Sequence, residues 1–229
     1  MCGRYTLTAD LDDLQTRFAF MAEGIELAPQ YNIAPTEDVL TVVSSENEGG
    51  EKNEAMMARW GFVSFWANSL AIGGKMINAR AETLLTKSAF KEAFLQRRCL
   101  VLADGFYDWR HEGKQRIPLR FTLKDEEPFA FAGIYATWRS PSGERVRSCS
   151  IITTETNELG AAIHDRMPVI LPREAEEAWM DPEDEDVGAL SELLLPYPSD
   201  QMRAYEVSTL VNSPRNNSPE CIAPIASLP

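Results

Sequence analysis

The second residue of the chain is a cysteine, in the opening Met1-Cys2-Gly3. Removal of Met1, which is expected before a small residue, gives Cys2 a thiol and the chain's own α-amine on adjacent carbons. The pKa of a free α-amine is about 7.7 to 8.0 and that of a thiol about 8.5, so both have usable nucleophilic fractions near neutral pH. Such an aminothiol favours aldehydes, because the thiol captures the imine formed by the amine and closes a thiazolidine ring.

Two further segments contain an amide and carboxylates. Asn78 begins Asn-Ala-Arg-Ala-Glu, where it either caps a helix or contributes its amide to a site. Asp104 and Asp108 lie in a strand-like run, so we expect both on one face, with one of them solvated or paired, and Gly105 permits a close backbone approach. A catalytic carboxylate is the alternative role for either aspartate.

The chain contains only two histidines, His111 and His164. His111 lies in a turn signal and is expected to be solvated. His164 is either a hydrogen-bonded structural residue or a proton shuttle, because an imidazole with a pKa near 6.5 exchanges protons at neutral pH. The candidates are therefore an aminothiol, an amide, a carboxylate and an imidazole, and no spacing rule joins them.

Strands are expected in the middle of the chain and helices towards its ends. The strand patterns cover 4–7, 39–44, 55–60, 99–109, 115–123, 129–135 and 148–154, with 39–44 and 55–60 forming a hairpin. Helices are expected after a Thr8 cap, over 81–97, from Thr156 to His164, after Pro172 and over 187–195. Because no alternating βαβ rhythm appears, we predict an α+β fold with a curved, largely antiparallel sheet.

Composition favours one domain over residues 1–229, with 44% hydrophobic and 25% charged residues. No stretch approaches the roughly 20 apolar residues of a membrane span and no secretion signal is evident, so a cytoplasmic location is expected. The cysteines form no CxxC pair, which disfavours structural zinc and a disulfide framework. We expect Cys99, Cys149 and Cys221 to be reduced core residues.

The net charge of -13 argues against non-specific coating of nucleic acid, which requires neutralisation of many phosphates. It leaves room for a local basic groove. The acidic runs read as solvated loops and helix faces. Arginines in apolar, motif-like segments are Arg4, Arg59, Arg80, Arg97, Arg98 and Arg166.

The order of ten segments resembles the SOS response-associated peptidase (SRAP) family, whose members crosslink to abasic DNA. The resemblance runs nearly end to end and is specific as an ordered set. The segments are residues 1–5, 31–36, 59–62, 78–83, 97–100, 104–109, 132–135, 151–154, 164–171 and 207–212. It implies the SRAP fold, a single domain with a barrel-like sheet core and peripheral helices.

The resemblance also implies roles for individual residues. Cys2, freed of Met1, would attack the ring-opened aldehyde of an abasic sugar in single-stranded DNA and form a stable thiazolidine. Asn78 and His164 match active-site residues of the family, and Asp108 stands where the family usually has a longer glutamate. The positions implied to contact DNA are Arg4, Arg80 and Arg166 at the backbone, Trp66 as a base-stacking residue in a more loosely matching loop, and Pro35 as a wedge.

The chemistry can be assigned to the same residues. His164 is the best candidate to open the sugar ring, Asp108 to take a proton from the amine, and Asn78 to position the amine or a sugar oxygen. The imine also permits β-elimination of the 3′ phosphate, so AP lyase activity is a minor expected outcome.

The expected partner is single-stranded DNA with abasic sites, with replication-fork components as further candidates. No cofactor, metal or membrane is expected, and the protein is predicted to be a monomer that associates with the nucleoid when bound to damaged DNA. The rival hypothesis is an N-terminal cysteine peptidase acting in autoproteolysis or on peptides. A non-catalytic DNA reader with an incidental Cys2 is the third alternative.

Overall fold

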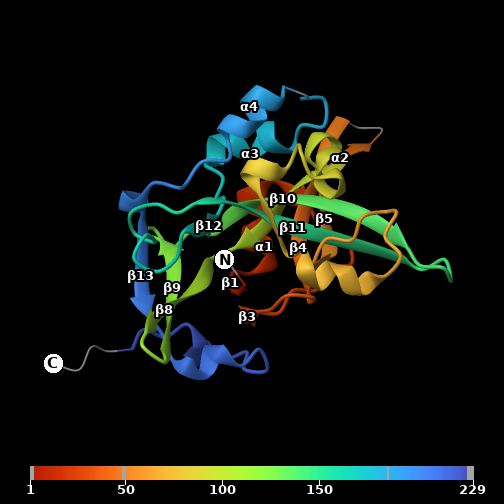
Figure 1. The fold of residues 1–229 in the computed structure, drawn as a ribbon. Helices are drawn as coiled ribbons and strands as arrows, with labels where there is room; N and C mark the ends of the chain where they lie inside the picture. Colours follow the sequence, from red (N-terminus) through yellow and green to blue (C-terminus); the bar gives the residue numbers. More distant parts are fainter. Residues whose placement is uncertain (1–2, 48–49, 185, 226–229) are drawn as a thin grey trace.

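A closed five-stranded barrel forms the centre of the computed structural model, which describes residues 3–47, 50–184 and 186–225 (Figure 1). In order around the barrel the strands are β4 (Asp38–Asn47), β5 (Gly50–Trp60), β11 (Arg145–Glu155), β10 (Phe129–Arg139) and β7 (Arg98–Ala103). The β5–β11 pair is parallel and the other four are antiparallel. The predicted curved, largely antiparallel, barrel-like core is confirmed, as is the hairpin now seen as β4 and β5.

A second, antiparallel sheet lies beside the barrel. Its order is β13 (Met202–Glu206), β9 (Gln115–Leu123), β8 (Gly105–Glu112), β1 (Tyr5–Leu7) and β3 (Gln30–Ile33). Three short strands border the barrel: β2 (Phe20–Met21) on β5, and both β6 (Asn78–Arg80) and β12 (Arg166–Pro168) on β11. The amino-terminal strand therefore lies in the second sheet, and Asn78 lies at the edge of the barrel.

Aromatic side chains join the two sheets into one hydrophobic core. The Tyr5 ring packs edge-on against Trp60 and Phe131, with ring centroids 5.2 and 5.7 Å apart. Phe106 of β8 also contacts Phe131, at 6.2 Å. β10 is apolar on both faces, and it lies between β7 and β11 and not at an edge.

The helices are peripheral. They are α1 (Leu11–Phe18), α2 (Ser88–Gln96), α3 (Arg173–Met180) and α4 (Val187–Glu192), with short 3₁₀ segments η1 (Leu70–Lys75), η2 (Ala81–Thr83), η3 (Ser199–Gln201), η4 (Thr209–Asn212) and η5 (Pro219–Cys221). Among the described residues no helix is both long and apolar enough to cross a membrane.

Three helix expectations were wrong. The helix predicted over 81–97 is interrupted, with η2 and α2 separated by a turn. The segment from Thr156 to His164 forms successive turns, in which Asn157 accepts the backbone N–H of Gly160. Thr8 does not cap α1, because its hydroxyl donates to the Asp104 carboxylate and Asp10 occupies the cap position.

The single strand expected over 99–109 is divided at Asp104, where the chain leaves the barrel as β7 and enters the second sheet as β8. The division leaves Asp104 between β7 and β8 and Asp108 within β8. Asp104 pairs with Arg120, whereas Asp108 lines a cavity with Phe106 and Phe121. The expectation that both carboxylates share one face was therefore wrong, although one of them is paired, as expected.

Candidate functional site

Asp108, His164 and Arg166 line one small cavity between the second sheet and the edge of the barrel. Asp108 comes from β8, His164 from the turn before β12 and Arg166 from β12 itself. The cavity walls are otherwise mainly apolar: Phe106, Phe121, Ile163, Met167 and Met202. The fold thus brings a carboxylate and an imidazole from distant parts of the chain into one partly desolvated space.

The His164 ring makes two contacts through the same nitrogen. Nδ1 accepts the backbone N–H of Arg166 at 3.0 Å and lies 2.8 Å from the Asp165 carboxylate. The first contact suits a neutral ring protonated on Nε2, and the second suits a protonated ring. Nδ1 therefore has an acceptor contact for one protonation state of the ring and a donor contact for the other, and the role of His164 as a proton shuttle stays a prediction. The side chain remains 35% exposed.

Asp108 lies beside the amino-terminal strand. Its side chain is buried, and its Oδ1 accepts the backbone N–H of Trp109 at 2.8 Å. Tyr5 pairs with Phe106, and Tyr107 N–H donates to the Arg4 carbonyl at 3.0 Å. Continuation of this antiparallel register by one residue places Gly3 opposite Asp108.

Cys2 itself lies outside the described residues. Its role as nucleophile therefore remains a prediction.

Asn78 is tied to the same strand through the core. Its side chain is half-buried on β6, opposite Ile151 of β11. The carbonyl of the preceding residue, Ile77, accepts Trp60 Nε1–H at 2.9 Å, and the Trp60 ring packs on Tyr5. Two contacts thus link the backbone beside Asn78 to the strand that follows Cys2.

Arg4 is held by the carboxyl-terminal part of the chain. Its Nη1 donates to Asn32 Oδ1 and to the Val211 carbonyl, both at 2.8 Å. Burial lowers the pKa of Arg4, and the charge of Glu37 offsets part of that effect. Arg4 therefore has a structural role in addition to its predicted DNA contact, which stays a prediction.

The two other predicted phosphate-binding arginines differ in exposure. Arg80 is exposed at the end of β6. Arg166 is largely buried and donates to both carboxylate oxygens of Glu82, at 2.6 and 3.0 Å, and to the Thr153 carbonyl at 2.6 Å. The hydrogen bond from Arg166 lowers the pKa of Glu82. A phosphate that contacts Arg166 must therefore share this guanidinium with Glu82.

Trp66 projects from the loop between β5 and β6 with 53% of its surface exposed. The backbone beside it is fixed, because Trp138 Nε1–H donates to the Ala67 carbonyl at 2.6 Å. The neighbouring Phe65 is 59% exposed and was not predicted as a site residue; its place next to Trp66 is the sequence signal that could have found it. Pro35 is half-buried in the turn between β3 and β4.

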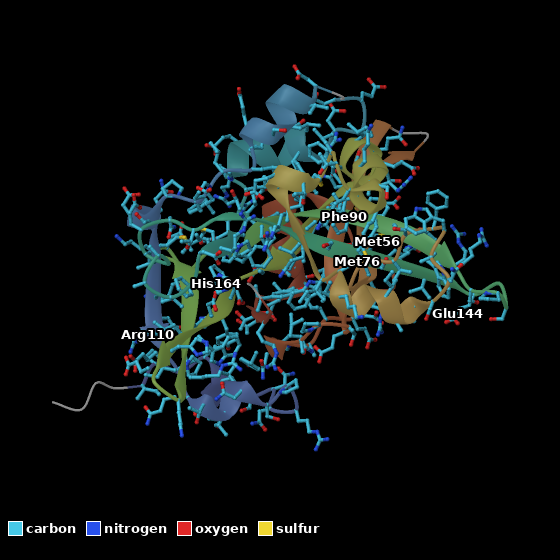
Figure 2. All side chains as sticks on the ribbon, viewed as in Figure 1. Met56, Met76, Phe90, Arg110, Glu144 and His164 are labelled. Atoms are coloured by element: carbon cyan, nitrogen blue, oxygen red, sulfur yellow. The ribbon has the colours of Figure 1, made fainter. Side chains whose placement is uncertain are left out.

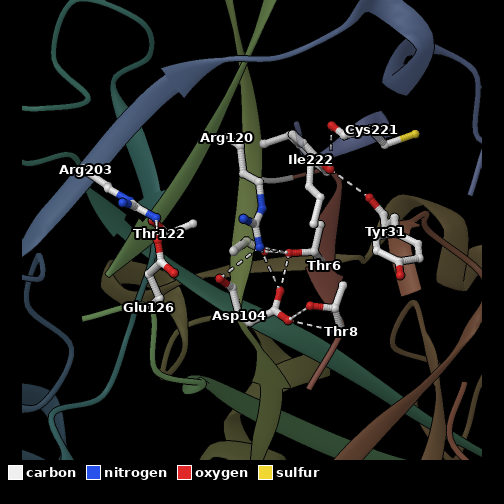
Figure 3. A network of polar contacts seen from close by, with 12 residues as sticks. Thr6, Thr8, Tyr31, Asp104, Arg120, Thr122, Glu126, Arg203, Cys221 and Ile222 are labelled. Carbon is white, nitrogen blue, oxygen red and sulfur yellow. Dashed lines mark hydrogen bonds and ion pairs between the residues drawn. The ribbon is translucent and has the colours of Figure 1, made fainter. Parts of the chain in front are cut away.

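The sequence did not indicate the polar network at Asp104, shown in Figure 3. The Asp104 carboxylate accepts hydrogen bonds from the Thr6 hydroxyl, from the backbone and hydroxyl of Thr8, and from Arg120 Nη2 at 3.0 Å. A Cβ at Gly105 would lie 2.7 Å from Arg120 Nε, so a larger residue there would displace the Arg120 guanidinium. We call these contacts the Asp104 clamp, and they tie β1 to the start of β8 and to Arg120 of β9 within the second sheet.

The three later cysteines and His111 have the predicted surroundings. Cys99, Cys149 and Cys221 are buried and free. Burial raises the pKa of the Cys99 thiol, and it raises that of Cys149 to about 12, so neither is a thiolate at neutral pH. His111 is exposed. Among the described residues, no group of three or more His, Cys, Asp or Glu side chains is placed to hold a metal ion.

Comparison with known proteins gives a consistent result. A family model described as SOS response associated peptidase (SRAP) matches residues 1–214. The chain is 47% identical over 226 residues to the abasic site processing protein YoqW of Bacillus subtilis, covering 97% of this chain and 99% of that one. It is 33% identical over 265 residues to the abasic site processing protein HMCES of Gallus gallus, covering 98% and 78% of the two chains.

Solved structures agree with the fold. A crystal structure of a protein from Bacteroides thetaiotaomicron matches with a TM-score of 0.88 at 31% identity, covering 98% of this chain and all of that one. A protein from Bordetella bronchiseptica matches with a TM-score of 0.78 at 26% identity, covering 90% of this chain.

Proposed function

The chain belongs to the SOS response associated peptidase (SRAP) family, and from this premise we propose that it senses abasic sites in single-stranded DNA and shields them by covalent crosslinking. Relatives that match nearly the whole chain are named abasic site processing proteins. The observation that carries the proposal is the cavity that Asp108 and His164 both line, close to β1, the strand that follows Cys2 in the sequence.

The proposed reaction uses both nucleophiles of Cys2. The α-amine adds to the aldehyde carbon of the ring-opened sugar, and the resulting carbinolamine loses water to give an imine. The thiol then adds to the imine carbon, the nitrogen gains a proton, and a thiazolidine results. No oxidant or cofactor is needed, because the only product released is water.

Three side chains assist these steps. His164 transfers the proton that opens the sugar, and its partly exposed ring in the cavity that it shares with Asp108 supports this role. Asp108 accepts a proton from the amine, and the register of β1 on β8, extrapolated from Tyr5 to Gly3, supports this role. Asn78 orients the amine or a sugar oxygen. β-Elimination from the imine gives a minor AP lyase activity.

We assign DNA contacts to Arg4, Arg80, Arg166, Trp66 and Pro35. Exposure of Trp66 supports base stacking, which contributes about 1 to 3 kcal/mol per base. Because the covalent crosslink retains the DNA, a few phosphate contacts are enough to bring the lesion to the site despite the acidic net charge. We also propose that the protein is a monomer and that replication-fork components are among its partners. On the same proposal it is cytoplasmic and associates with the nucleoid when it is bound to damaged DNA.

Intact-mass measurement tests the proposal. The wild-type protein should lack Met1 and form a stable one-to-one adduct with abasic single-stranded DNA without added reductant. Cys2→Ala should abolish the stable adduct, whereas Cys221→Ala, at a buried thiol, should retain it. Undiminished stable crosslinking by Cys2→Ala would remove Cys2 from its role, and turnover of peptides without a DNA adduct would favour the peptidase alternative.

A further inference from the structure

A groove lined by Arg59, Arg145 and Arg147 opens at the end of β11 remote from His164, beside Leu70 of η1. We propose that this arginine groove binds the phosphate backbone of the DNA strand that leads away from the lesion. The inference rests on the proposed function, since it assigns a further part of the same substrate.

The three guanidinium groups lack partners within the described part of the chain. None forms an ion pair or a side-chain hydrogen bond there, although the protein has 35 acidic residues and several other arginines are paired with them. Arg59 Nε is buried without a hydrogen-bond acceptor. Such a donor costs about 1 to 3 kcal/mol when unpaired, so an external anion that supplied an acceptor would bind favourably.

Like charges also face one another across the hairpin of β10 and β11. Arg139 is the direct register partner of Arg145, and Arg147 lies two residues further along the same strand. Like charges directly opposite each other destabilise a strand pair, and successive side chains on one face lie two residues apart. The hairpin therefore concentrates positive charge, and a bound phosphate backbone would relieve the repulsion.

Two carboxylates, Asp38 and Glu144, line the same groove. Neither forms an ion pair with the three arginines, and the arginines outnumber them. Glu144 lies at the tip of the hairpin, well apart from His164 (Figure 2). The local charge is thus positive in a chain whose net charge is -13.

The groove and the candidate site lie along one strand. Ile151, the register partner of Asn78, follows Arg147 by four residues, or about 13 Å of extended strand. That distance corresponds to about four nucleotides at helical spacing, and to fewer in an extended strand. The loop that displays Trp66 continues directly into η1, whose Leu70 lines the groove. A strand stacked on Trp66 can therefore continue into the groove.

The test compares abasic oligonucleotides of different lengths. A short one has two nucleotides on each side of the lesion, and longer ones extend the 5′ or the 3′ side by about ten nucleotides, within the range that single-strand binding surfaces cover. Crosslinking rates at subsaturating DNA are measured over a range of salt concentrations. Wild type should react faster with one of the extended oligonucleotides, with a steeper salt dependence than on the short one.

The variant is R145Q/R147Q, which removes two exposed charges. On the favoured extended oligonucleotide, the slope of log rate against log salt should become shallower by about 1.4, since each lost single-strand contact contributes about 0.7. On the short oligonucleotide the rate should stay within twofold of wild type. The control K124Q/R173Q makes the same change in net charge at exposed residues outside the groove and should leave both slopes unchanged.

Two results would overturn the inference: an unchanged slope on extended DNA, or an equal loss on short and extended DNA. Failure of the proposed function looks different, because wild type would then form no adduct with any abasic oligonucleotide. The groove remains testable in that case by equilibrium binding of intact single-stranded DNA, where R145Q/R147Q must show the same loss of salt dependence.

Discussion

At the scale of single residues, reactivity depends on how far each titratable group is withdrawn from water. The thiols of Cys99 and Cys149 are buried and have raised pKa values, whereas the two histidines keep exposed surface. Asp108 is buried in a cavity whose other walls are mainly apolar, beside the strand that leads from Cys2. The burial of each side chain therefore decides whether it can react at neutral pH.

Thiol alkylation checks this selection. Native protein treated with iodoacetamide should gain one label, at Cys2, because thiolates are the reactive form and the other three thiols are buried. Cys2→Ala should gain none, and denatured wild type should gain four. A second label on the native protein would show that a core thiol is accessible. Peptide mass mapping identifies each labelled site.

Replacement of Asp108 by glutamate tests the shortened carboxylate. Asp108→Glu restores about one C–C bond of reach towards the amine, and proton transfer requires heavy atoms within about 2.6 to 3.2 Å. We expect a single-turnover crosslinking rate equal to or higher than that of wild type. Asp125→Glu, at an exposed position, serves as the control. Complete loss of activity would mean that the cavity has been rebuilt around the shorter acid.

At the scale of elements, the position of β1 depends on the Asp104 clamp. β1 has only three residues and pairs with β3 and β8, while the clamp binds the side chains of Thr6 and Thr8. Arg120 extends the network to the Tyr205 hydroxyl at 2.8 Å. A short strand is thereby held at its far end from Cys2, which limits the positions that the nucleophile can adopt.

Asp104→Asn tests whether the Asp104 clamp positions β1 for the reaction or only stabilises the folded protein. Removal of one partner from a buried ion pair costs about 3 to 5 kcal/mol, because Arg120 keeps an uncompensated charge. Chemical denaturation measures that loss. Crosslinking per folded molecule, at saturating abasic DNA, should slow by about tenfold or more if a shift of β1 costs roughly 1.4 kcal/mol in the reacting geometry.

The matched control is Glu176→Gln. The Arg17–Glu176 pair between α1 and α3 has nearly the same burial, with side chains 10% and 9% exposed against 9% and 8% for Arg120 and Asp104. Its loss should lower stability similarly and leave the rate per folded molecule unchanged. Equal rates for both variants would show that the clamp acts through stability alone.

At the scale of the whole molecule, the carboxyl-terminal segment is fastened to the amino-terminal one. Asn32 is buried and donates to the carbonyls of Val211, Ser213 and Asn216, at 3.2, 3.0 and 2.8 Å, while its own oxygen accepts Arg4. Figure 1 shows η4 and η5 below the second sheet, near β3. Arg4 therefore depends on residues some two hundred positions away.

Asn32→Ala tests this connection. Three carbonyls lose a donor, and at about 1 kcal/mol for each net hydrogen bond the expected destabilisation is about 2 to 4 kcal/mol. Thermal unfolding measures it, with Asn68→Ala at an exposed position as the control. A change below about 0.5 kcal/mol, the usual range for surface substitutions, would contradict the connection.

The sequence by itself determined the family and the α+β sheet core and supplied the hypothesis for the reaction and its residues, because a 1,2-aminothiol, the strand periodicities and the ordered motifs are local features. The buried state of the later cysteines also followed from their apolar surroundings. The helix over 81–97 and the shared face of Asp104 and Asp108 failed for one reason. The spacing of apolar residues does not reveal where a strand leaves one sheet and enters another. Nor does it reveal where a helix is interrupted by a turn.

Only the tertiary structure decided which polar groups meet. It paired Asp104 with Arg120, placed Asp108 and His164 in one cavity, and placed Arg59 beside the arginines of the β10–β11 hairpin. These partners are separated by long stretches of sequence, and no local rule fixes their contact. Burial, register and barrel closure bring them together, since each strand must satisfy its backbone hydrogen bonds while its apolar side chains reach a common core.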